Sequence, residues 1–299
     1  MSDPVQEPPA GAGDADGQLP RRTARSARVQ ESLAQVGYLA GPSLTTAVFL
    51  AGELEQPLLL EGEAGVGKTE VARALAASLG ARLIRLQCHE GLGLHQAVYD
   101  WDYQRQLLSI RAAEAGAASS ELFGRAFLLR RPLLEALEHD GPCVLLIDEI
   151  DRADDEFEAF LLEFLADFAV TIPELGTITA ARRPHVVLTS NRTRELHDAL
   201  KRRCLYQWID YPSREREVAI VHARLPGVPD AIVLRVCGAV ARLRELDLYK
   251  QPGIGETITW TRALLAMGGE GDLQDTIFAA LKVREDIDRV LGGGVLDGV

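Results

Sequence analysis

Several features are scarce in this sequence of 299 residues, and each scarcity excludes a class of protein. Only four cysteines occur, never as a Cys-x-x-Cys pair, so neither a zinc site nor a redox motif is expected. No apolar run approaches the roughly 18 residues of a membrane span, and the chain does not open with the basic-then-apolar pattern of a signal peptide. We therefore expect a soluble, cytoplasmic protein with reduced thiols.

Basic residues are also few. There are 32 of them against 44 acidic residues, which gives a net charge of -12. Affinity for nucleic acid backbones depends on dense lysine and arginine, so this balance disfavours a nucleic-acid-binding protein. The six histidines show no spacing typical of metal ligands.

The order of apolar patterns predicts two domains after a tail. Residues 1–24 are rich in proline, glycine and aspartate and are expected to be disordered. Short apolar runs that alternate with helical patterns then predict an α/β domain over 25–211 with a five-stranded parallel sheet, the strands falling at 58–60, 83–86, 143–147, 186–189 and 206–209. Beyond residue 211 we expect a small all-α domain over 212–299, with helices near 214–225, 231–246, 259–267 and 272–291.

Residues 88–130 are too many for one connection between strands, so we interpret them as an insertion. Aromatic and acidic residues alternate over 99–103, and 106–115 follow a helical pattern. Trp101 and Tyr103 could grip a partner chain or pack a small core, and their spacing favours packing.

The strongest motif is Gly-x-x-x-x-Gly-Lys-Thr over residues 62–69, between a predicted strand and a predicted helix. Its glycines allow backbone N–H groups to face phosphate oxygens, and the helix start adds partial positive charge. The lysine would reach the outer phosphates and the threonine would bind Mg²⁺. The alternative is a simple glycine-rich turn. The expected nucleotide-binding residues are Gly62, Glu63, Ala64, Gly65, Val66, Gly67, Lys68 and Thr69.

A second motif follows the buried strand at 143–147. Asp148 would lie at the carboxyl end of that strand, where parallel sheets bind ligands, and is a candidate Mg²⁺ ligand. Glu149 is the candidate base, since a carboxylate beside the metal ligand can polarise an attacking water. The same acidic residues would also favour the start of a following helix, which is the structural alternative.

Two further candidates come later in the chain. Asn191 ends the strand at 186–189 and could orient the water or contact the γ-phosphate, although an asparagine after a strand is usually a turn residue. Arg202 and Arg203 belong to a basic cluster before the last strand. Either an arginine reaches a neighbouring subunit's γ-phosphate, or the cluster is a solvated turn.

Together these motifs resemble those of the AAA+ ATPases of the MoxR group, and within it the branch encoded beside carbon monoxide dehydrogenase. The resemblance is strong from about 58 to 212 and loose beyond. The matching segments are residues 62–69, 145–153, 170–175, 189–191 and 196–204.

The resemblance implies an αβα sandwich with a helical lid, which hydrolyses ATP with Mg²⁺ between the subunits of a ring, commonly a hexamer. It implies a partner with a von Willebrand factor A domain and a task in maturing a molybdenum hydroxylase. It gives Asn191 the first sensor position and Arg203 the arginine-finger position. It also implies that the insertion and a hairpin at about 170–180 face the pore.

The chain departs from the group at two positions. Many relatives have Asp-Arg-Phe where this chain has Arg202-Arg203-Cys204, so either arginine could be the finger. Many have a Pro-Arg pair where this chain has Thr259-Trp260-Thr261-Arg262, so Arg262 is either a second sensor or an exposed helix arginine.

Three functions are compatible with these motifs. The first is ATP hydrolysis that drives remodelling or metal-cofactor maturation of a partner. The second is a nucleotide-gated binding switch, which an intact Glu149 and Asn191 argue against. The third is a DNA-directed AAA+ protein, which the acidic net charge disfavours.

Overall fold

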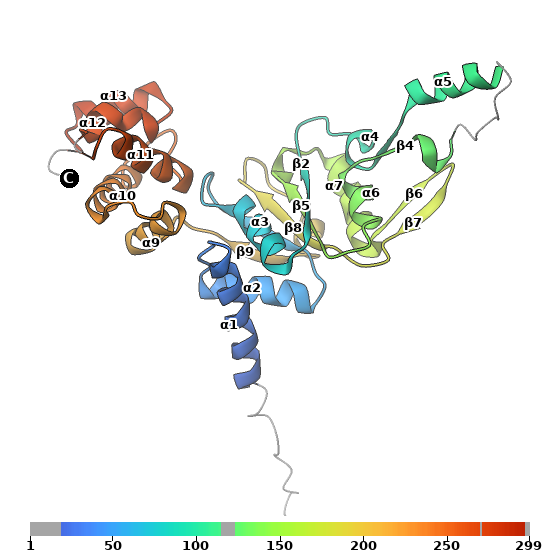
Figure 1. The fold of residues 1–299 in the computed structure, drawn as a ribbon, viewed down its shortest axis with the longest axis horizontal. Helices are drawn as coiled ribbons and strands as arrows, with labels where there is room; N and C mark the ends of the chain where they lie inside the picture. The colour runs from blue at the N-terminus through green and yellow to red at the C-terminus, as the bar shows by residue number, and fades with distance from the viewer. Residues whose placement is uncertain (1–18, 115–122, 270, 297–299) are drawn as a thin grey trace, which may run out of the picture.

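The structure is a computed structural model that describes residues 19–114, 123–269 and 271–296. Residues 1–18 of the expected disordered tail lie outside this part. The first helix begins at Leu19, before the expected end of the tail at residue 24. The α/β domain carries a separate bundle of helices at one end (Figure 1).

The central sheet has five parallel strands, which confirms the predicted fold class. Every residue of β5, which lies between β2 and β8 in the sheet, is buried, as expected for a strand covered on both faces. All five strands end at one edge, so the segments that follow β1, β5 and β8 lie side by side. In spatial order the strands are β2 (Arg82–Gln87), β5 (Cys143–Asp148), β8 (His185–Ser190), β1 (Leu58–Glu61) and β9 (Leu205–Trp208).

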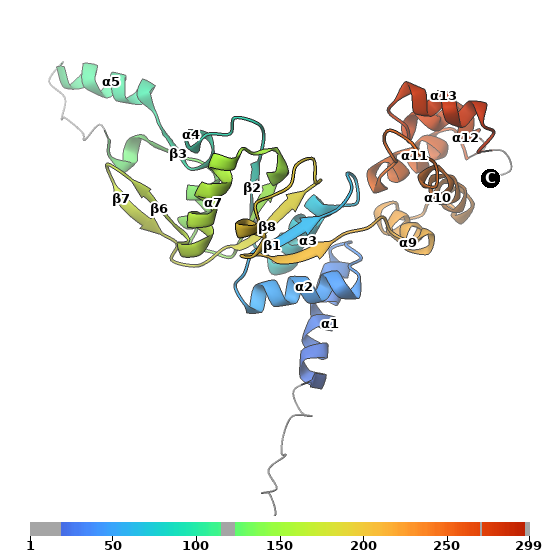
Figure 2. The ribbon, with the colours of Figure 1, turned by 180° about the vertical axis from the view of Figure 1, so that it is seen from behind.

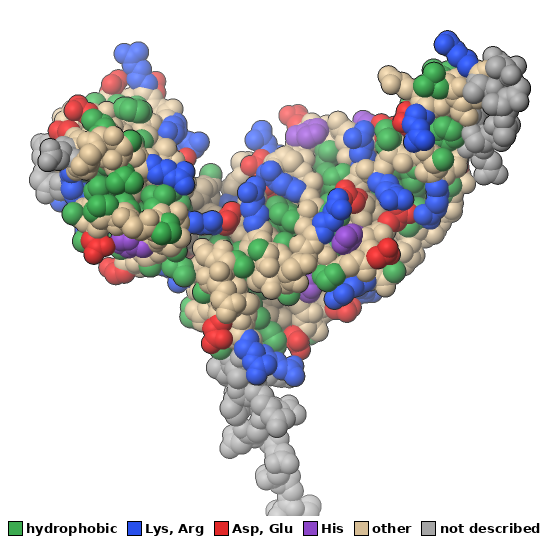
Figure 3. All heavy atoms as spheres, viewed as in Figure 1, with side chains coloured by type: hydrophobic (Ala, Val, Ile, Leu, Met, Phe, Trp, Pro, Cys, Tyr) green, Lys and Arg blue, Asp and Glu red, His purple; other side chains and the backbone are tan. Residues whose placement is uncertain are grey.

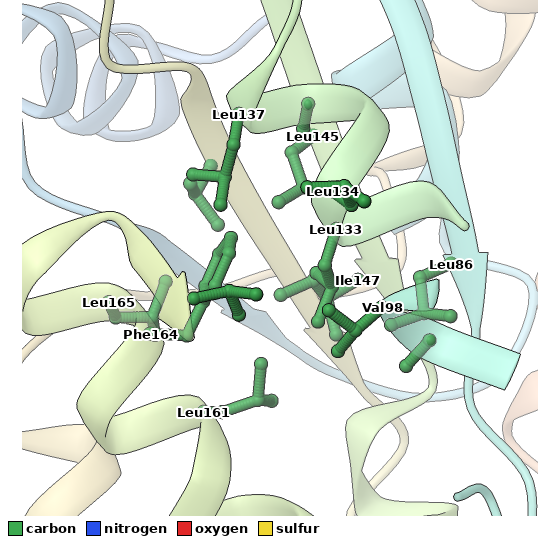
Figure 4. Close-up of a cluster of buried hydrophobic side chains, with 14 of the residues drawn as sticks. Leu86, Val98, Leu133, Leu134, Leu137, Leu145, Ile147, Leu161, Phe164 and Leu165 are labelled. Atoms are coloured by element: carbon green, nitrogen blue, oxygen red, sulfur yellow. The ribbon is translucent and has the colours of Figure 1, made fainter. Parts of the chain in front are cut away.

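Alternate strand residues feed two cores, one on each face of the sheet. Leu58 and Leu60 pack with α1 (Leu19–Gln35), α2 (Pro42–Glu53) and α3 (Lys68–Leu79). Leu59 packs on the other face with residues of α6 (Pro132–Leu137) and α7 (Asp155–Asp167). Figure 4 shows part of this second core, including Leu133 of α6 and Phe164 of α7. This alternation follows from the two-residue period of a strand and produces the layered arrangement.

The insertion and a later hairpin form small ribbons beside the sheet. Trp101 is 7% exposed and meets Phe123 edge-on at 5.4 Å between ring centroids, whereas Tyr103 is 61% exposed. Figures 1 and 2 show α5 projecting from the body of the molecule. The elements are α4 (Leu94–Ala97), β3 (Tyr99–Trp101), α5 (Tyr103–Glu114), η1 (Arg125–Phe127), β4 (Leu128–Arg130), and the hairpin β6 (Ala169–Ile172) and β7 (Gly176–Thr179).

The C-terminal region is helical, as predicted, and packs around the buried Trp260, whose indole N–H donates to Thr276 Oγ1 at 2.8 Å. The helix expected at 272–291 is wrong as one element. It is broken after η3, where the Lys282 ammonium binds the carbonyls of Phe278 and Ala279. The helices are α9 (Arg214–Arg224), α10 (Asp230–Arg244), α11 (Ile254–Ala266), α12 (Leu273–Thr276), η3 (Ile277–Ala279) and α13 (Arg284–Gly292).

None of the helices in the described residues is long and apolar enough to span a lipid bilayer.

Candidate functional site

The glycine-rich loop directly follows β1 and ends where α3 begins at Lys68. Gly65 and Gly67 have φ values of 82° and 95°, which residues with side chains rarely adopt. At Gly62 a Cβ atom would lie 2.2 Å from the Ile209 carbonyl oxygen. These positions therefore require glycine, and the tight loop they allow leads into a helix N-terminus, the geometry of a phosphate cradle.

The Lys68 side chain is buried at the base of this loop. Its ammonium donates to the carbonyl oxygens of Gly62 and Glu63, both at 2.7 Å. Burial lowers the pKa of Lys68, and nearby carboxylates, Asp151 first among them, partly oppose that effect. The loop carbonyls thus hold the ammonium where an anion bound in the loop would meet it.

Thr69 and Asp148 meet across the space between α3 and β5. Thr69 Oγ1 donates to Asp148 Oδ1 at 2.9 Å, and Thr189 Oγ1 donates to the same oxygen at 2.5 Å. Arg85 Nε donates to Asp148 Oδ2 at 2.9 Å. Because Thr69 gives its proton to Asp148, its lone pairs remain available to a cation. Hydroxyl and carboxylate oxygens are suitable ligands for Mg²⁺, so Thr69 and Asp148 fit the predicted metal.

Glu149 and Asn191 are presented by neighbouring strand ends. Glu149 has a left-handed backbone with φ 56°, and its N–H donates to Thr189 Oγ1 at 2.9 Å. Its side chain is 37% exposed, so water can reach it. Asn191 follows β8, and its N–H donates to Asp151 Oδ2 at 3.2 Å. Both residues line the same cavity as the glycine-rich loop.

That cavity has a volume of about 1160 Å³ and lies where the surface is indented between the sheet and the helical domain (Figure 3). It is large enough for a nucleotide, since ligand pockets typically measure about 300 to 1,000 Å³. The predicted site residues that line it are Ala64, Gly65, Val66, Gly67, Lys68, Thr69, Asp148, Glu149, Asn191 and Arg262.

Gly62 and Glu63 do not line the cavity directly, but their carbonyls hold Lys68. Arg202 and Arg203 do not line it either. They follow α8 (Asp198–Lys201), before the first residue of β9, are exposed, and form no ion pair with any described residue. The structure thus gathers the other predicted site residues and leaves this pair outside.

The sequence patterns missed one wall of the cavity. Tyr38 and Leu39 connect α1 to α2, and Arg216 of α9 donates to the Leu39 carbonyl at 2.5 Å. Burial raises the pKa of Tyr38 to about 12. The wall unites segments almost 180 residues apart, which no local sequence pattern reveals. Arg85 was also missed, because its partner Asp148 is distant in the sequence.

The helical domain touches the glycine-rich loop. Ile254 N–H, at the start of α11, donates to the Gly65 carbonyl at 3.0 Å. Tyr211 Oη donates to the Ala64 carbonyl at 3.3 Å, and the Arg244 guanidinium lies 4.4 Å from the centre of the Tyr211 ring. The helical domain is therefore in direct contact with the phosphate-binding loop.

The domain is a P-loop nucleotide-binding domain with the AAA+ α/β fold. It combines this order of parallel strands with a glycine-rich loop after β1 and acidic residues at the end of β5. Residues 57–204 match the model of the AAA domain, dynein-related subfamily. AAA domains are ATPase modules, so this part of the chain is an ATPase domain.

One curated relative is a ClpA homolog protein from Fuscovulum blasticum. It is 30% identical over 142 residues, which are 46% of this chain and 16% of that protein. The chain thus spans only a small part of the length of this relative.

Proposed function

We propose that this chain hydrolyses ATP at a site shared between two subunits and uses the energy to remodel a partner protein. The observation that carries the proposal is the division of the site. Lys68, Thr69, Asp148, Glu149 and Asn191 come together around one cavity, whereas the exposed arginine pair lies outside it.

Each residue has a role that its position supports. The loop N–H groups and Lys68 bind and orient the phosphates. Thr69 and Asp148 would hold Mg²⁺, which neutralises phosphate charge when it is bound. Glu149, half-exposed beside these residues, takes a proton from the attacking water. Asn191 holds the water or the γ-phosphate in line.

Arg203 completes the site from a neighbouring subunit. An arginine that neutralises charge in the phosphoryl-transfer transition state is worth about 10³- to 10⁵-fold in rate. Since Arg203 does not reach the cavity of its own chain, only a second copy can bring it there. Head-to-tail contacts of this kind form a ring when the rotation between subunits closes, and we propose that they close as a hexamer.

At a finer level, we propose a MoxR-type ATPase that works with a von Willebrand factor A domain protein on a molybdenum hydroxylase. The motifs at 62–69, 145–153, 189–191 and 196–204 support this proposal. The exposed apolar residues of α5 support a contact with another protein, since Tyr103, Leu107 and Leu108 are 59 to 64% exposed.

The shared site is tested by mixing two inactive variants, Glu149→Gln and Arg203→Ala. In a mixed ring, some interfaces combine an intact Glu149 with an intact Arg203, so about a quarter of wild-type turnover should return at equal amounts. Turnover of the wild type should also rise more steeply than linearly with protein concentration. If the mixture stays as inactive as its components while both variants still assemble, the shared site is wrong.

A second measurement separates a motor from a switch. If Glu149→Gln binds ATP and still supports maturation of the partner enzyme in cells, ATP binding alone is sufficient and the remodelling proposal fails.

A further inference from the structure

Asp151 is a buried acidic residue to which neither the motifs nor the proposed reaction assigns a role. It lies in η2 (Ile150–Arg152), two residues after Glu149, and is 3% exposed. A carboxylate at this depth is costly unless its oxygens receive hydrogen bonds. Its partners therefore indicate what it does.

Those partners all lie on the segment that follows β8. Asp151 Oδ2 accepts the N–H of Asn191 at 3.2 Å, the N–H of Thr193 at 2.8 Å and the hydroxyl of Thr193 at 2.7 Å. Arg192, between these two residues, has a left-handed backbone with φ 56°. Such a conformation persists only where its surroundings fix it, and the carboxylate fixes the residues on both sides.

A second set of hydrogen bonds joins the same two segments. Thr189, near the end of β8, donates through its hydroxyl to Asp148 and accepts the N–H of Glu149. Asp151 and Thr189 thus join the segment that holds Glu149 to the segment that holds Asn191 at two points. The candidate base and the candidate sensor are therefore fixed relative to each other.

The other carboxylate oxygen, Oδ1, is buried and has no hydrogen-bond partner among the described residues. Asp151 does not line the cavity itself, so it affects the site through the residues that it holds.

We propose that Asp151 is a positioning residue that acts through Asn191, holding its backbone so that the side chain faces the γ-phosphate in register with Glu149. This inference rests on the proposed function. It predicts that loss of Asp151 slows hydrolysis without weakening nucleotide binding, because its side chain hydrogen-bonds Asn191 and Thr193 and does not line the cavity.

The test is a double-mutant cycle. Asp151→Ala and Asn191→Ala should each lower kcat by about 10- to 100-fold, as expected when a reacting group is misplaced by about 1 Å. The affinity for a fluorescent ATP analogue should change by less than about twofold in both variants. The double variant should be no slower than Asn191→Ala, since Asp151 has nothing left to position.

Three further variants guard against a general loss of structure. Asp151→Asn keeps an acceptor oxygen for the two N–H groups and should recover part of the rate. Thr193→Ala removes one donor and should lower kcat by a smaller factor, about three- to tenfold. Asp154→Asn alters a nearby carboxylate that accepts the N–H of Phe157 at the start of α7, and it should match the wild type.

The outcomes separate this inference from the proposed function. If Asn191→Ala is slow but Asp151→Ala hydrolyses ATP at the wild-type rate, Asp151 does not position Asn191 and the proposed function stands. If the two losses multiply in the double variant, Asp151 acts independently and the inference is overturned. If Asn191→Ala itself retains full turnover, the role of Asn191 fails and the inference fails with it.

Discussion

The two halves of the proposed active site are built in opposite ways. Lys68 and Asp148 are 6% and 2% exposed, and each makes hydrogen bonds that fix its position. Arg202 and Arg203 are exposed and form no ion pair within the described part of the chain. One half is thus organised by its own chain, whereas the arginine side chains of the other half form no ion pair with any described residue to order them.

The difference has a physical consequence. A long, free side chain loses about 1.5 to 2 kcal/mol of rotamer entropy when it is fixed. The buried half has already lost that freedom on folding, but the arginine pair loses it only when a second subunit docks. We therefore expect nucleotide binding to be a property of the single chain and hydrolysis to be a property of the assembly.

The largest expected effect is on the arginine side. Arg203→Ala should lower turnover by about 10³- to 10⁵-fold because the transition-state charge loses its counterion. Nucleotide affinity should stay within about threefold of the wild type, since Arg203 does not line the cavity of its own chain. The measurement is steady-state ATP turnover at protein concentrations where sedimentation shows assembly.

Arg202→Ala is the matched control, because it removes the same charge one residue away. It should keep at least about a tenth of wild-type turnover. If Arg202→Ala is the slower variant, Arg202 is the arginine finger. If both variants are active, neither arginine takes part in catalysis.

The next largest effect is expected at Glu149, on the same half of the site as Lys68 and Asp148. Glu149→Gln keeps the shape of the side chain but removes the base, so kcat should fall by about 10²- to 10⁴-fold while ATP remains bound. Single-turnover hydrolysis measures the fall in the rate of the chemical step, and equilibrium binding of ATP measures whether the nucleotide remains bound. Glu163→Gln, an exposed carboxylate of α7, should show wild-type kinetics. Loss of binding in Glu149→Gln would mean that the carboxylate is structural.

A smaller effect is expected where the helical domain meets the glycine-rich loop. A Cβ atom at Gly253 would lie 2.7 Å from the Gly65 Cα, so Gly253→Ala forces the two apart. Overpacking of this kind costs about 1 to 3 kcal/mol, which should weaken ATP binding by at least about fivefold. Isothermal titration with ATP measures this change.

Gly292 supplies the control, because a Cβ there meets nothing within 4 Å and the residue does not line the cavity. Gly292→Ala, at the end of α13, should leave ATP affinity unchanged. Equal affinities for the two variants would show that the contact between the helical domain and the loop does not contribute to binding.

These contrasts explain what could be predicted from the sequence. The five strands were predictable because a strand buried on both faces requires a continuous apolar run, as in β5. The glycine-rich loop and Asp148-Glu149 were predictable because their chemistry fixes residue types at short spacing.

Contacts between distant segments were not predictable in this way. Arg85 reaches Asp148 from a neighbouring strand, and Arg216 reaches the Leu39 carbonyl from α9 of the helical domain. Asp151 was visible only as one more acid after a strand, because its role depends on where residues 191–193 fall in space. No local pattern records such a meeting.

The smallest effect on hydrolysis is expected in the insertion, where Trp101 and Tyr103 repeat the contrast between a packed and an unpacked group. Trp101→Ala should destabilise the fold by about 3 to 5 kcal/mol, as large aromatic truncations in cores do, whereas Tyr103→Ala should change stability by less than about 0.5 kcal/mol. Chemical denaturation measures both.

Because Tyr103 is exposed together with Leu107 and Leu108 on the projecting α5, changing all three to serine should keep ATP turnover within about twofold and abolish binding of a partner protein. A helix that carries exposed apolar residues at no benefit to its own fold is explained by a second surface that covers them. If the triple variant instead unfolds or loses ATPase activity, α5 contributes to the stability or the activity of the ATPase domain itself, and the partner contact must lie elsewhere.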